Sequence, residues 1–173
     1  MPIATDITLN EANHVYTDSK GIVYRSASNI IGKYKAPFEK DKIAAKQAAK
    51  TGESTEDIIA QWDSAAPYGT SVHKQMEDYF LRKDSETDLI EPYLPILEKW
   101  RKFDYKFHPE VILCIRELRI AGTADMLVER DDDTWSILDW KTNKRIRKQG
   151  FFGKTMERPL WHLPDCNFIH YSL

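Results

Sequence analysis

The sequence predicts an α+β fold in which helices come first and strands follow. Between residues 27 and 107 most segments carry helix signals, whereas segments after residue 110 are rich in β-prone residues. The length of 173 residues suits one hydrophobic core and is short for two. We therefore expect one domain over residues 1–173, with a hairpin and helices in residues 1–66 and the core in residues 67–173.

The N-terminal part is predicted to begin with a β-hairpin. Two β-prone runs, residues 14–17 and 22–24, flank a cluster of turn-type residues. A short helix over residues 27–33 is expected next, with Ser26 or Ser28 as its cap.

Four further helices are expected before residue 108. The first covers residues 41–50, and the second covers residues 54–62 with an acidic first turn. The third opens at Gly69-Thr70, and the fourth covers residues 92–107 and is closed by His108-Pro109. The third helix carries an apolar stripe that consists of Val72, Met76, Tyr79 and Phe80.

Three strands are predicted after these helices, over residues 111–115, 118–128 and 135–140. The polar turn 131–133 joins the last two strands. The expected core is thus a three-stranded antiparallel meander flanked by helices, followed by a basic loop over residues 141–158.

Composition excludes several classes of protein. Hydrophobic residues make up 42% and charged residues 30% of the chain, which is ordinary for a globular domain. No apolar run approaches the roughly 20 residues of a membrane span, and the two cysteines, Cys114 and Cys166, do not form a metal motif or a disulfide framework. We expect an intracellular protein of a bacterial cell, a virus-infected cell or an organelle matrix. The net charge of −2 leaves room only for a local basic groove.

Two acidic residues on neighbouring predicted strands are the first candidates for a reaction centre. Asp125 and Asp139 lie at equal sequence distances from Asp132, in the middle of the predicted turn. In an antiparallel hairpin such residues face each other, with Cβ atoms about 4.5–5.5 Å apart. A divalent cation would relieve the repulsion between the two carboxylates.

Lys141 is expected on the same strand face as Asp139, because side chains alternate along a strand. Carboxylate ligands with open water positions suit Mg²⁺ or Mn²⁺, which can activate a phosphodiester for attack by water. A lysine beside the cation can orient that water and offset charge on the phosphate. These residues therefore indicate phosphodiester hydrolysis.

Two motifs carry a resemblance to a known family. Asp125 together with Asp139-Trp140-Lys141 resembles the D…(D/E)XK signature of the PD-(D/E)XK nuclease superfamily, and residues 68–77, with His73, resemble the first motif of its RecB-like branch. Residues 37–62 add a similarity to phage-type exonucleases and to the mitochondrial genome maintenance exonuclease group. The resemblance covers most of the chain.

This resemblance implies roles for particular residues. It implies that His73, Asp125, Asp139 and the main-chain carbonyl of Trp140 bind the metal, and that Lys141 is catalytic together with the two acids. Glu110 matches an acid often found in the family. The expected substrate is DNA, at single-stranded or frayed ends, with a further protein partner or an oligomer left open.

The resemblance also predicts where the chain departs from the family. Members continue past a segment like Tyr171-Ser172-Leu173 into a helix with a Gln-x-x-x-Tyr motif and a further strand. We therefore expect the C-terminal end of the core to be missing here.

Structural alternatives stay open for each candidate. His73 can form a pair with Glu77 one turn away, and Asp139 can form an exposed ion pair with Lys141. The basic run after the predicted site can contact phosphates or simply face solvent; it consists of Lys144, Arg145, Arg147 and Lys148. The function expected is a Mg²⁺- or Mn²⁺-dependent deoxyribonuclease, with a non-cleaving DNA-end or partner-binding module and a metal-stabilised structural domain as rivals.

Overall fold

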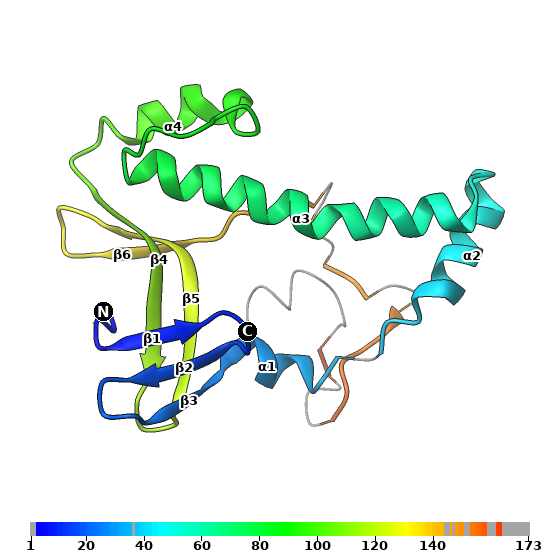
Figure 1. The fold of residues 1–173 in the computed structure, drawn as a ribbon, viewed down its shortest axis with the longest axis horizontal. Coiled ribbons are helices and arrows are strands. Elements are labelled where there is room, and N and C mark those ends of the chain that lie inside the picture. The colour runs from blue at the N-terminus through cyan, green and yellow to red at the C-terminus, as the bar shows by residue number, and fades with distance from the viewer. Residues whose placement is uncertain are drawn as a thin grey trace.

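The described residues form six strands in one curled sheet at one end of the molecule (Figure 1). The computed structural model describes residues 3–35, 37–143, 146, 148–150, 153–158 and 162–163. The strands are β1 (Ile7–Asn10), β2 (Val15–Asp18), β3 (Val23–Ser26), β4 (Lys106–Ile115), β5 (Ile120–Glu129) and β6 (Trp135–Leu138). Their order is β1-β2-β3-β5-β4, and β6 also pairs with β5.

One long helix, α3, passes the sheet and extends away from it to α2 (Figure 1). The helices are α1 (Ala27–Gly32), α2 (Lys40–Thr51), α3 (Thr55–Phe80), a 3₁₀ turn η1 (Glu91–Tyr93) and α4 (Leu94–Trp100). The N-terminal half of α3 packs against α2, and its C-terminal half lies between the sheet and α4. The predicted α+β class is confirmed.

The central strand β5 pairs with three other strands of the sheet. It pairs antiparallel with β4 on one side and with β6 on the other, and it pairs parallel with β3 near its start. The β5–β6 register runs from Glu129↔Trp135 to Met126↔Leu138, which is the register predicted around Asp132. Strand β6 ends at Leu138, two residues earlier than expected.

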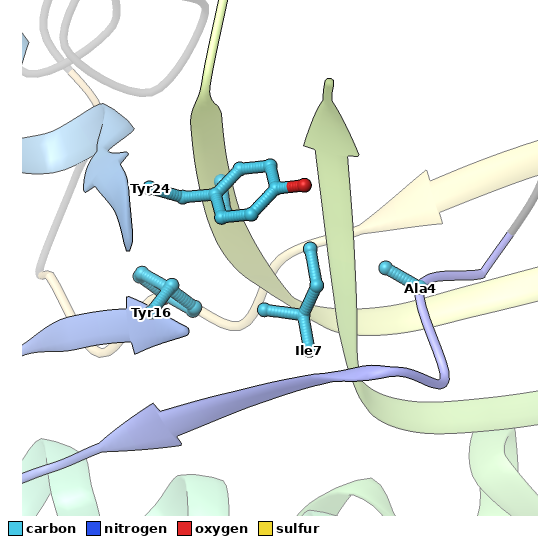
Figure 2. Packing of buried hydrophobic residues seen from close by; sticks show 5 residues of the cluster. Ala4, Ile7, Tyr16 and Tyr24 are labelled. Atoms are coloured by element: carbon cyan, nitrogen blue, oxygen red, sulfur yellow. The ribbon is translucent and has the colours of Figure 1, made fainter. Parts of the chain in front are cut away.

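The predicted N-terminal hairpin is confirmed as β2 and β3, but the sequence reasoning missed β1, which adds to β2. These strands enclose a small core (Figure 2). The residues that form it are Ala4, Ile7, Tyr16, Tyr24 and Ala121. The phenol oxygen of Tyr16 lies 3.0 Å from the hydroxyl of Thr123 on β5, so this core ties the hairpin to the central strand.

Asp18 holds the turn between β2 and β3. Its buried carboxylate accepts hydrogen bonds from the backbone N–H groups of Lys20 and Ile22, both at 2.9 Å, and from the hydroxyl of Tyr24 at 3.3 Å. Asp18→Ala is expected to lower the free energy of unfolding by about 2–3 kcal/mol, because hydrogen bonds to charged groups are strong and their donors would lose this partner. Urea unfolding checks this, with exposed Asp84→Ala as control; equal stability of the two variants would contradict it.

The prediction of two separate helices before residue 80 is wrong, since α3 runs without a break from Thr55 to Phe80. The prediction that residues 41–50 form a helix is confirmed, and Gly52 ends it in the left-handed conformation. Pro67 lies inside α3 and removes one helical hydrogen bond, a cost of about 3 kcal/mol in isolation. Packing of α3 against α2 and β4 on either side of Pro67 offsets that cost.

The fourth predicted helix is too long. The structure has η1 and α4 only up to Trp100, and residues 106 and 107 already belong to β4. His108-Pro109, expected to close a helix, lies within β4 instead. A proline is tolerated there because β4 is the last strand of the sheet, where a missing N–H does not break a ladder on the outer side.

A second core joins α3 to α4. Its buried members are Val72, Met76, Ile90 and Leu97. Aromatic side chains that include Phe80, Trp100 and Trp140 pack around them. This core holds α3, α4 and the segment after β6 together, and so it positions the residues described next.

Candidate metal centre

His73 on α3 points at the middle of β5 and at the segment after β6. The adjacent Val72 is buried in the second core and fixes the orientation of the helix. Nε2 of His73 lies 2.8 Å from the carbonyl oxygen of Trp140, and Nδ1 lies 3.5 Å from Oδ2 of Asp125. Because a carbonyl oxygen only accepts, the proton of the first contact lies on Nε2.

Glu110 lies opposite Asp125 across β4 and β5. The neighbouring pairs, Pro109↔Met126 and Val111↔Ala124, fix this register. Glu110 itself has a φ of 51°, a left-handed conformation that residues with a side chain rarely adopt. Such a backbone costs about 1–3 kcal/mol, and strain of this kind concentrates at functional sites.

Three side chains from distant parts of the sequence converge at this point. One ligand atom each of His73, Glu110 and Asp125 can be chosen so that all three lie within 4.8 Å of one another. They come from α3, β4 and β5 respectively. The cluster contains two carboxylates and an imidazole, and a backbone carbonyl lies at hydrogen-bond distance from the imidazole. This donor set fits a divalent cation such as Mn²⁺ or Mg²⁺.

The electrostatics of the cluster favour a positive charge. Burial raises the pKa of Asp125, but the contact with His73 and the N–H of Trp140 outweigh it, and the net pKa lies below the ordinary value. The contact with Asp125 raises the pKa of His73 against the effect of burial. Burial, then the negative charges of Asp125 and Glu77, raise the pKa of Glu110. The neighbouring carboxylates repel each other, and a cation would relieve that repulsion.

Trp140 joins the cluster through its backbone. Its N–H donates to Oδ2 of Asp125 at 2.7 Å, while its carbonyl accepts from His73. Its indole lies nearly parallel to the rings of Phe80 and Trp100, at centroid distances of 6.3 and 6.4 Å. The side chain therefore anchors this segment in the second core, and the backbone presents a carbonyl to the site.

Asp139 and Lys141 lie beside the cluster. Asp139 follows β6 directly, at the next register position opposite Asp125, and its side chain is 45% exposed. Its carboxylate contacts the ammonium of Lys141 at 2.6 Å. The structure thus brings His73 and Asp125 together with Glu110, and it places Asp139 in an ion pair with Lys141 at the edge of the same site.

The basic run predicted to contact DNA lies mostly outside the described residues. Lys144, Arg145 and Arg147 fall outside them, and Lys148 is exposed. Their proposed role stays a prediction.

Comparison with families of known proteins decides the assignment. Residues 39–152 match the family model of the PD-(D/E)XK nuclease superfamily, which is more than half of the chain. The chain belongs to the PD-(D/E)XK nuclease superfamily. Among curated proteins and among solved structures, nothing matches it.

The part of the chain that matches PD-(D/E)XK nucleases contains the whole cluster. It begins just before α2 and ends beyond Lys141, so it includes α3, α4 and β4 to β6, whereas β1 to β3 precede it. Nucleases of this superfamily generally use divalent metal ions and act on DNA, and the donor set described above fits such an ion.

In the described part of the chain, no helix combines the length and the apolar character needed to cross a membrane.

Glu110 offers a test of backbone strain at the candidate site. Glycine adopts a φ of 51° at no steric cost, so Glu110→Gly is expected to have a free energy of unfolding about 1 kcal/mol above that of Glu110→Gln. Both variants lose the carboxylate and should bind Mn²⁺ more weakly than the parent. Urea unfolding and Mn²⁺ titration measure the two effects. A glycine variant less stable than the glutamine variant would rule out strain at this position.

Proposed function

We propose that this chain is a Mg²⁺- or Mn²⁺-dependent deoxyribonuclease that hydrolyses phosphodiester bonds at DNA ends. We further propose that it is an exonuclease of the RecB-like branch, related to phage-type and mitochondrial exonucleases, and that it acts in DNA replication, repair or recombination on single-stranded or frayed ends. Membership of the superfamily supports the chemistry, and the motif around His73 supports the branch.

The observation that carries the proposal is the convergence of His73, Glu110 and Asp125. Each side chain is on a different element, and one ligand atom of each falls within 4.8 Å of the others. Glu110 is exposed and Asp125 is 15% exposed, and two carboxylates this close repel each other, at a cost in free energy, unless a positive charge compensates them. A cation-binding role accounts for that cost, and it also accounts for the left-handed backbone of Glu110, which keeps the residue in the cluster.

The proposed cation ligands are His73, Glu110, Asp125, Asp139 and the carbonyl of Trp140. When bound, a divalent cation supplies Lewis acidity toward a phosphoryl oxygen and lowers the pKa of a water molecule. Asp125 holds the backbone of Trp140 in place through its 2.7 Å hydrogen bond, which keeps the carbonyl directed at His73. This arrangement preorganises the site before any ligand arrives.

Lys141 is the proposed catalytic lysine. Its ammonium lies 2.6–2.7 Å from the oxygens of Asp139, so it is held at the edge of the cluster. From there it donates hydrogen bonds to the attacking water or to a phosphate oxygen, and its positive charge offsets the negative charge that develops on the phosphate.

The test is degradation of end-labelled DNA by the purified chain. Single-stranded DNA, duplex DNA and RNA of one sequence are incubated with Mg²⁺, Mn²⁺ or EDTA. We expect cation-dependent loss of DNA, abolished by EDTA, with single strands degraded first and a product ladder that gives the polarity. A folded chain that binds Mn²⁺ and DNA but cleaves neither single-stranded nor duplex DNA would overturn the nuclease proposal. It would support the non-cleaving DNA-end module.

A further inference from the structure

Three exposed apolar side chains gather next to the candidate metal centre. Tyr68 on α3, Tyr93 on η1 and Ile96 on α4 are 50%, 53% and 49% exposed. All three line one open pocket of about 570 Å³. Apolar side chains that are exposed singly are common, but three that converge on one concave surface beside a reactive site indicate a ligand.

The walls of this pocket differ in chemistry. Apolar side chains from α3 and α4 form one side, and these are Val72, Met76, Leu97 and Trp100. The segment from Asp139 to Asn143 forms the other side and includes Lys141 and the hydroxyl of Thr142. This segment approaches α3 closely, since a Cβ at Gly69 would lie 3.4 Å from Oγ1 of Thr142. The pocket is therefore apolar on one side and polar, with an ammonium, on the other.

We propose that this pocket binds an unpaired nucleobase next to the hydrolysed phosphodiester, and that Tyr68 and Tyr93 are the surfaces on which the base stacks. The inference rests on the proposed nuclease function and names the residues that select its substrate. A nucleotide has an apolar, aromatic base and an anionic phosphate, which match the two sides of the pocket. Lys141 belongs to the polar wall and also to the proposed catalytic site, so a base in the pocket lies adjacent to the phosphate there.

The shape of the pocket favours an unpaired strand over a duplex. Its volume of about 570 Å³ falls within the range of small-molecule sites. A base in a duplex is stacked on both faces and paired at its edge, and it must leave the helix before it can enter such a pocket. Stacking on aromatic side chains tolerates any sequence, because every base has a π-face. The pocket thus gives strand selectivity without sequence selectivity.

The test uses 2-aminopurine, whose fluorescence falls when it stacks. Oligonucleotides carry it at successive positions from each end and are titrated with the protein in Ca²⁺, a hard cation that binds the same type of donors. We expect quenching at a position near one end. Tyr93→Ala should restore the fluorescence and raise the Kd for single strands about tenfold, or about 1.4 kcal/mol, with the Kd for duplex DNA unchanged.

Two further variants control for folding and for general loss of aromatic surface. Tyr93→Phe keeps a stacking ring and should behave like the parent. Phe103→Ala removes an aromatic residue that is 48% exposed but lines a different pocket, and it should also leave quenching and affinity unchanged. Thermal unfolding of all variants shows whether each is folded.

The results separate this inference from the proposed function. Bound single strands without quenching at any position, or equal affinities of Tyr93→Ala and Phe103→Ala for single strands, would overturn the base pocket. An equal loss of single-strand and duplex affinity in Tyr93→Ala would overturn its selectivity. Cleavage of the same oligonucleotides in Mn²⁺ is scored separately, so a nuclease without a base pocket and a base pocket without nuclease activity give different results.

Discussion

Asp125→Asn is expected to weaken Mn²⁺ binding by more than about 100-fold and to reduce DNA cleavage by about 1,000-fold or more. Asp125 is 15% exposed, lies at the centre of the cluster and has a pKa below its ordinary value, so it contributes a full negative charge at neutral pH. A cation that stabilises transition-state charge contributes several kcal/mol, and about 4 kcal/mol corresponds to about 1,000-fold in rate. Calorimetric Mn²⁺ titration and cleavage of labelled DNA measure both losses.

Asp125→Asn is expected to leave the fold intact. The amide of asparagine has nearly the volume of the carboxylate, and its oxygen can still accept the N–H of Trp140. Asp131→Asn is a matched control, because this exposed acid lies in the turn of the same hairpin. Cleavage by Asp125→Asn within tenfold of the control would contradict the assigned role of Asp125.

Lys141→Ala is expected to reduce cleavage by about 100- to 10,000-fold, the usual contribution of a positioned acid or base, without any loss of Mn²⁺ affinity. The reason is that Lys141 contacts Asp139 at the edge of the site and contributes no ligand atom to the cluster. Its removal takes away a positive charge near the cation, so the Mn²⁺ affinity should rise rather than fall. Single-turnover cleavage and Mn²⁺ titration separate the two effects.

Two variants make this result specific. Lys141→Arg keeps the positive charge but presents it on a guanidinium with a different hydrogen-bonding geometry. This variant should recover only part of the cleavage rate. Lys106→Ala removes an exposed lysine that pairs with Glu129 at 2.7 Å at the far end of β5, and it should cleave like the parent. Loss of Mn²⁺ binding in Lys141→Ala, or cleavage as fast as that of Lys106→Ala, would show that Lys141 is not a catalytic residue.

The β5–β6 register could be predicted because one residue pattern fixes it. Asp131 to Asp133 mark the turn, and pairing follows from the position of Asp132 at its centre. Counting residues outward from the turn between β4 and β5 in the same way could have placed Glu110 opposite Asp125. Strand β4 pairs with β5 so that residue 110 lies opposite residue 125. The predicted start of that strand at residue 111 excluded Glu110, because the aromatic segment before it had been assigned to a helix.

Tertiary contacts explain the remaining differences between the predicted elements and those in the structure. The break predicted in α3 rests on local helix signals at residues 54–62 and 69–80, whereas packing against α2 and the sheet keeps one helix through Pro67. Strand β1 was missed because its four residues gain their partner only from β2. The ion pair of Asp139 with Lys141 was weighed as an alternative and is present in the structure, at the edge of the candidate site.

The most direct test of the central claim is whether His73 coordinates the bound cation. Electron spin echo envelope modulation of Mn²⁺ bound to the chain detects a directly coordinated imidazole nitrogen. We predict nitrogen modulation from one imidazole in the parent protein and its loss in His73→Gln at saturating Mn²⁺. Bound Mn²⁺ without nitrogen modulation, or modulation that survives in His73→Gln, would contradict a metal centre formed by His73, Glu110 and Asp125.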